Sequence, residues 1–150
     1  MSKEKTAELA RELSRAMIET RNLLRRHIQV KIKAHNINIS FELLEVLALL
    51  YRKDGINQQE IAGIMVKDKS SLTYLIDCLV KRKLVIRKAD AEDRRNKLIC
   101  LTKEALALKT KLNPWIVEIY ENATATIKAA DIKNAIELVE KMNENLKRKL

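Results

Sequence analysis

The segment Asn57–Leu101 reads NQQEIAGIMVKDKSSLTYLIDCLVKRKLVIRKADAEDRRNKLICL, and its pattern decides the fold. Its first part holds two short helical patterns joined by a tight turn, Gln58–Met65 and Lys69–Arg82. Its second part holds two short apolar runs, 84–86 and 98–101, on either side of a charged loop. Apolar runs of this length bounded by polar turn residues are typical of two paired strands. The segment therefore predicts two helices followed by a β-hairpin.

The second helical pattern has one apolar face and one polar face. Its large apolar residues recur at i, i+3, i+4, i+7 and i+8, which is the spacing of a buried helix face: Leu72, Leu75, Ile76, Leu79 and Val80. The opposite face holds Ser70, Tyr74, Asp77 and Lys81, a set that suits contact with bases and phosphates. A solvated face is the plain alternative. Charge favours the first reading, because residues 67–97 carry ten Lys or Arg against five Asp or Glu. The segment is thus interpreted as a winged helix-turn-helix motif.

The hairpin loop carries the most specific pattern in the chain, Asp90-x-x-Asp93-Arg94-Arg95-x-Lys97 followed by Leu101-Thr102. Together with Ile61-Ala62 and the run 67–79, this pattern resembles the multiple-antibiotic-resistance regulator (MarR) family. The resemblance extends over a long leading helix and two trailing helices, so it covers nearly the whole chain. It implies a dimeric DNA-binding transcription regulator, of the repressor type that a small ligand releases from a pseudo-palindromic operator.

The sequence departs from the family pattern at three places. The turn between the two helices usually carries Gly where this chain has Val66. The helix end that commonly reads Lys-Gly-Leu has Lys83 in the middle position. Arg is usual at the positions of Tyr74 and Cys78 in the recognition helix. The first two departures bear on local backbone geometry, and the third alters how bases are read.

The bulk composition fits a helical protein with a polyanionic partner. A chain of 150 residues with 47% hydrophobic and 33% charged residues has the size and composition of one globular domain. Two Gly and one Pro favour helix almost throughout. The formal charge of +10 favours a polyanion such as DNA, RNA or anionic lipid. No apolar run reaches membrane-spanning length and no secretory signal is visible, so we expect a cytoplasmic protein without a membrane partner.

No pattern of catalytic or metal-binding residues is visible. Cys78 and Cys100 are too few for a disulfide framework, and neither has the spacing of a metal site. The sequence shows no Ser/His/Asp or Cys/His arrangement and no phosphate-cradling Gly loop. We therefore expect no enzyme activity, no cofactor and no metal.

The two ends of the chain predict a dimerisation base. From Glu4 to about Lys33, apolar residues recur at close to every fourth position, and the segments 103–127 and 131–150 carry similar stripes. The chain has no further large element to cover these stripes. We expect a mainly α fold with a small β-hairpin, as one domain in which 1–36 and 103–150 form the dimerisation helices. Residues 37–102 form the DNA-binding lobe, and the protein is a homodimer.

The site residues follow from the polar helix face, the basic hairpin and the resemblance. The predicted DNA-binding set is Lys69, Ser70, Ser71, Thr73, Tyr74, Lys81, Asp93, Arg94, Arg95 and Lys97. The resemblance implies that Arg95 enters the minor groove while the carboxylate of Asp93 braces its guanidinium. It also implies a small aromatic ligand, for which Tyr51, Trp115 and Tyr120 are candidates; packing in the core or the dimer is their alternative role. The alternative function is an RNA- or ribosome-binding module without ligand control.

Overall fold

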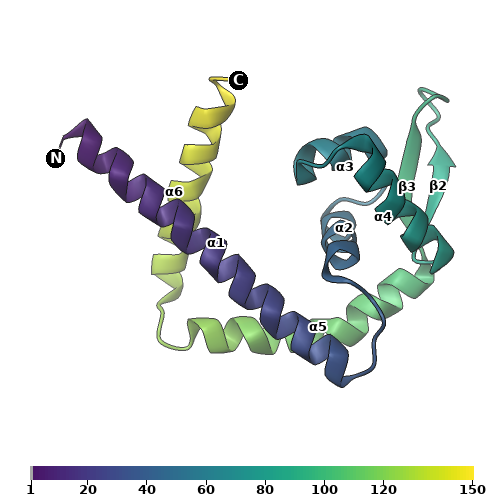
Figure 1. Ribbon diagram of the computed structural model, residues 1–150, viewed down its shortest axis with the longest axis horizontal. Coiled ribbons are helices and arrows are strands. Elements are labelled where there is room, and N and C mark those ends of the chain that lie inside the picture. Colours follow the sequence, from purple (N-terminus) through teal and green to yellow (C-terminus); the bar gives the residue numbers. More distant parts are fainter. Residues whose placement is uncertain (1) are drawn as a thin grey trace. The chain divides into compact units, whose positions relative to one another are not determined.

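The computed structural model describes residues 2–150 as nine elements (Figure 1). They are α1 (Lys3–Ala34), α2 (Phe41–Arg52), β1 (Ile56–Asn57), α3 (Gln58–Met65), α4 (Lys69–Lys81), β2 (Val85–Ala89), β3 (Lys97–Leu101), α5 (Lys103–Thr124) and α6 (Ala129–Lys147). The predicted fold class, mainly helical with a winged helix-turn-helix lobe, is confirmed. The chain forms two compact units, Met1–Ile116 and Val117–Leu150. The division into a DNA-binding lobe and a dimerisation base stays a prediction.

The sheet has three antiparallel strands in the order β1-β3-β2, one more than the predicted hairpin. β2 and β3 pair along their whole length, with Val85 opposite Leu101. β1 adds a two-residue edge strand, with Ile56 opposite Ile99. Two residues are too few to show the alternation by which a strand is recognised in sequence. The additional strand ties the start of α3 to the wing.

The core of the winged lobe lies between α2, α3, α4 and the sheet. The predicted apolar face of α4 is confirmed, because four of its five residues are buried and Val80 is half-buried. α2 contributes the fully buried Val46, Leu47 and Leu50, consistent with its nearly apolar sequence. Each such side chain gains about 1.5–3 kcal/mol from leaving water. This packing gives α4 a fixed orientation on the lobe.

Two turns of the lobe adopt the left-handed conformation without glycine. Val66 ends α3 with φ 51°, and Lys83 follows α4 with φ 60°. These are the positions where the family pattern has Gly, which adopts positive φ without a steric penalty. Val66 and Lys83 adopt this conformation with a Cβ atom, at a cost in local strain.

The outer helices leave apolar side chains uncovered in the single chain. In α1 the one buried residue is Ile32, while Leu9, Ile18, Leu23 and Val30 are each about half exposed or more. In the second unit, α6 has no buried residue. Apolar helix faces of this extent need a partner surface. In the part of the chain that the structure describes, no helix is long and apolar enough to cross a membrane.

Candidate nucleic-acid interface

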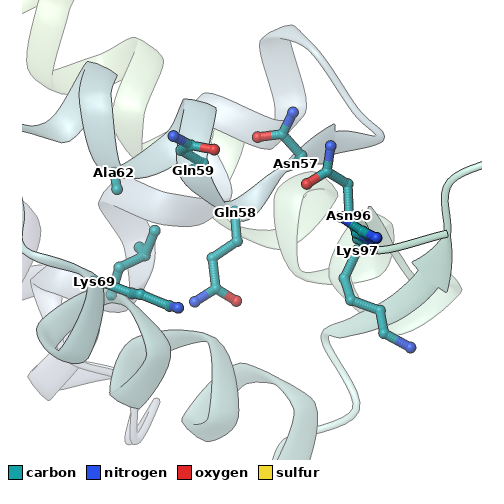
Figure 2. A pocket seen from close by; sticks show the side chains of 9 residues that line it. Asn57, Gln58, Gln59, Ala62, Lys69, Asn96 and Lys97 are labelled. Atoms are coloured by element: carbon teal, nitrogen blue, oxygen red, sulfur yellow. The ribbon is translucent and has the colours of Figure 1, made fainter. Parts of the chain in front are cut away.

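A groove of about 500 Å³ lies between the helix pair α3–α4 and the tip of the wing (Figure 2). Nine residues line the groove, and all except Ala62 and Leu72 are polar or basic. They are Asn57, Gln58, Gln59, Ala62, Lys69, Leu72, Arg95, Asn96 and Lys97. Three of the nine are cations, four are amides and none is acidic. A concave surface with this lining suits an anion that runs between the helices and the wing.

Ser71, one of the predicted DNA-binding residues, is hydrogen-bonded to the residue that caps α4. Asp68 Oδ1 accepts a hydrogen bond from the Ser71 backbone N–H at 2.8 Å, and Asp68 Oδ2 accepts one from Ser71 Oγ at 2.7 Å. These two bonds hold the pKa of the Asp68 carboxyl below its ordinary value. Asp68 is therefore the N-cap of α4. Because the Ser71 hydroxyl donates to the cap, it is less available to a base than the sequence suggested.

Thr73 was predicted to contact DNA, but its hydroxyl is hydrogen-bonded within the lobe. Its Oγ1 donates to the carbonyl oxygen of Lys69 at 2.8 Å and accepts from Gln58 Nε2 at 2.7 Å. The side chain is half-buried and links α4 to α3. Gln58 was not among the predicted site residues, because its proximity to Thr73 depends on the packing of two helices.

Other side chains of α4 that were predicted to contact DNA lie on its exposed face. Ser70, Tyr74 and Lys81 are exposed on it, and Tyr74 is 68% exposed. Asp77 on the same face forms an ion pair with Arg87 of β2, at 2.6 Å between Oδ1 and Nη2. This ion pair, which was not predicted, connects α4 to β2 of the wing.

Asp93 orders the wing tip through bonds to the backbone of its own turn. Asp93 Oδ1 accepts from the backbone N–H of Arg95 at 3.0 Å, and the Asp93 carbonyl accepts from the Asn96 N–H at 2.9 Å. The expected brace between the Asp93 carboxylate and the Arg95 guanidinium is absent from the ion pairs of the described residues. The carboxylate is instead satisfied by the backbone of its own turn, as Asp commonly is two residues before a free N–H. Arg94, Arg95 and Lys97 are exposed around this turn.

Two of the three candidate ligand residues, Tyr51 and Trp115, have contacts within the chain. The Tyr51 hydroxyl donates to the carbonyl oxygen of Ala105 at 2.6 Å, and burial raises the pKa of Tyr51 to about 12. The Trp115 ring lies 3.9 Å from the ring of His35, measured between centroids. Tyr120 is 50% exposed. None of the three lines the groove between the helices and the wing.

The two cysteines lie apart from any metal-binding arrangement. Cys78 and Cys100 are free and half-buried, and burial raises the pKa of the Cys100 thiol. Among residues 2–150, no group of three or more His, Cys, Asp or Glu side chains could hold a metal ion.

The winged lobe matches a known protein family. Residues 39–97 match the model of the MarR family. The chain is 26% identical over 144 residues to the HTH-type transcriptional regulator MhqR of Bacillus subtilis (strain 168), which covers 96% of this chain and 95% of that relative.

Solved structures share the fold over most of the chain. A MarR transcriptional regulator from Methanosarcina mazei Go1 superimposes with a TM-score of 0.77 at 24% identity, covering 93% of this chain and 99% of that one. The MepR protein of S. aureus, solved as a complex with DNA, superimposes with a TM-score of 0.70 at 22% identity, covering 88% and 96%. At these identities the likeness concerns the fold.

Proposed function

We propose that this chain, whose residues 39–97 match the MarR family of transcriptional regulators, binds duplex DNA as a homodimer and represses transcription. The observation that carries the proposal is the groove between the helix pair and the wing, with three cations and no acid in its lining. Release of the DNA by a small aromatic ligand completes the proposal and rests on the family resemblance.

The groove lies where a winged helix-turn-helix needs to hold one strand of the duplex. When a recognition helix lies in the major groove and the wing reaches the flanking minor groove, the sugar–phosphate strand that separates the grooves passes between them. In this chain α4 and the wing tip border the same groove through Lys69 and Arg95. Phosphate contacts there set position and affinity and carry no sequence information.

Base reading falls to the exposed face of α4 and to the wing tip. Ser70 and Tyr74 are exposed on α4, and the Tyr74 phenol offers both a donor and an acceptor to base edges. Arg95 at the wing tip suits a narrow minor groove, whose negative potential attracts a guanidinium. Arg94 and Lys97 are then left for phosphates.

A second copy of the chain would cover the apolar faces of the outer helices. α1 buries one residue of its 32, and α6 buries none of its 19. Two-fold association is the commonest closed arrangement of soluble proteins, and it presents two recognition helices to two half-sites. The expected operator is therefore pseudo-palindromic, with half-sites about one helical turn apart.

The small aromatic ligand would bind against Tyr51, Trp115 or Tyr120. Because the Tyr51 hydroxyl is satisfied by Ala105, its ring rather than its hydroxyl would meet the ligand. Titrating aromatic acids into the protein–operator complex tests this part. The expected result is release of DNA, and binding that persists at saturating acid would leave a regulator without such control.

Selection from a random duplex library tests the main proposal. The expected result is enrichment of an inverted repeat, together with sedimentation as a dimer at micromolar concentration. Competition with structured RNA separates DNA binding from the alternative RNA-binding function. RNA that competes as well as the selected duplex would contradict the proposal, and a stable monomer would contradict the dimer.

A further inference from the structure

We infer that Gln58 contacts the DNA backbone through its amide, and that Thr73 is a positioning residue that orients this amide rather than a reader of bases. The inference rests on the proposed function, because it assigns a role within the same groove. It adds a binding residue that the sequence pattern did not indicate, and it changes the role of one that it did.

The hydrogen bonds leave one orientation for the Gln58 amide. Thr73 Oγ1 lies 2.8 Å from the carbonyl oxygen of Lys69, an acceptor, so the hydroxyl donates its single proton there. The same oxygen can then only accept from Gln58, which lies 2.7 Å away. Nε2 therefore faces Thr73, and Oε1 faces away from it. Since a primary amide has two N–H donors, one remains after the bond to Thr73.

The Gln58 side chain that carries this donor lines the groove. Gln58 is the first residue of α3 and lines the groove together with Lys69, and Figure 2 shows their side chains extending from the two facing helices. Arg95 and Lys97 line the opposite side, on the wing. A neutral amide donor beside these cations suits a phosphate oxygen, which accepts several hydrogen bonds at once.

Thr73 is poorly placed to read a base. Its hydroxyl has both its donor and an acceptor position in use within the lobe, and the residue is half-buried against α3. To donate to a base edge, the hydroxyl would need to release the Lys69 carbonyl. Tyr74, the next residue, is 68% exposed and has no such constraint.

Four variants test this arrangement by binding titration at fixed salt on a set of operator variants. Gln58→Leu removes the amide, Thr73→Val removes the hydroxyl at nearly constant shape, and Thr73→Ser keeps the hydroxyl. Thr110→Val is the matched control, because Thr110 makes the same bond to the carbonyl four residues before it, in α5. Thermal unfolding of each variant establishes that the protein is folded at the assay temperature.

The expected losses follow from the loss of one hydrogen bond. Gln58→Leu and Thr73→Val should each weaken binding about 3- to 10-fold. The double variant should lose no more than either single variant, because both remove the same contact. Thr73→Ser and Thr110→Val should bind as the wild type does. The ranking of operator variants should not change, and the salt dependence should stay constant because the amide is neutral.

Several results would overturn the inference. A changed ranking of operators for Thr73→Val would make Thr73 a base reader. Additive losses in the double variant would make the two residues independent, and wild-type binding by Gln58→Leu would remove the contact. Failure of the proposed function is distinguishable, because the wild-type protein itself would then select no duplex.

Discussion

Replacing Val66 by glycine should stabilise the protein without touching its DNA-binding surface. Val66 ends α3 in the left-handed conformation, with φ 51° and ψ 48°. Its side chain is 90% exposed, so the substitution removes almost no buried area. The backbone bonds of the turn, including Lys67 N–H to the Ala62 carbonyl at 3.0 Å, need no side chain at this position. Relief of strain therefore dominates the effect.

The magnitude follows from two opposing contributions. The left-handed conformation costs a residue with a Cβ atom about 1–2 kcal/mol. Glycine offsets part of this gain in stability, because it increases the conformational entropy of the unfolded chain, which costs about 0.4–1 kcal/mol. The expected net gain for Val66→Gly is about 1 kcal/mol, which raises the unfolding temperature by about 2–4 °C for a chain of this size.

Calorimetry and urea unfolding measure this gain. Val66→Ala is the matched control, because alanine removes the branched side chain but keeps the Cβ atom and most of the strain. Lys83→Gly, at φ 60°, should shift stability in the same direction. A Val66→Gly protein that is no more stable than the alanine variant would refute the argument from backbone strain.

Three further predictions concern the wing, the recognition helix and the core. Arg95→Ala should weaken operator binding by about 1–3 kcal/mol in titrations, most on A·T-rich flanks; Asp93→Ala should also weaken binding, although it removes a negative charge, and tighter binding would reduce the wing to a plain basic loop. Asp68→Ala should lower the unfolding temperature. Because the pKa of the Asp68 carboxyl is lower in the folded protein than in the unfolded chain, its contribution to stability is present above the ordinary pKa and is lost as pH falls through the folded value. The unfolding temperatures of the wild type and the variant should therefore converge at acid pH. Tyr51→Phe should lower the free energy of unfolding in urea by about 1 kcal/mol. Because the pKa of Tyr51 is raised from 10.0 to about 12 in the folded protein, the stability that its protonated hydroxyl contributes is full below pH 10 and is lost as pH rises through 12. The phenylalanine variant should lack this loss.

The helices and the core of the lobe were predictable because their signals are local. The spacing of Leu72, Leu75, Ile76 and Leu79 reports a buried face directly, and Asp68 stands where a cap is needed. Periodicity and capping act over one or two helical turns, so they are visible in a single sequence. The strand positions of the wing followed from equally local apolar runs.

The details of the site were not predictable because they join separate elements. The contacts Gln58–Thr73 and Asp77–Arg87 link residues 15 and 10 positions apart, and they depend on how α3, α4 and β2 pack. Asp93 has the expected neighbour but binds its backbone, a choice between two nearby partners that the sequence pattern does not resolve.

The salt dependence of operator binding tests the central claim that the groove holds the DNA backbone. In wild type and Lys69→Ala, the slope of log K against log salt concentration counts the phosphates neutralised by the protein. The slope for Lys69→Ala should be about 0.9 shallower than for wild type, with all operators weakened alike. Lys141→Ala, in α6, is the control and should keep the wild-type slope. An unchanged slope for Lys69→Ala would contradict a strand in the groove.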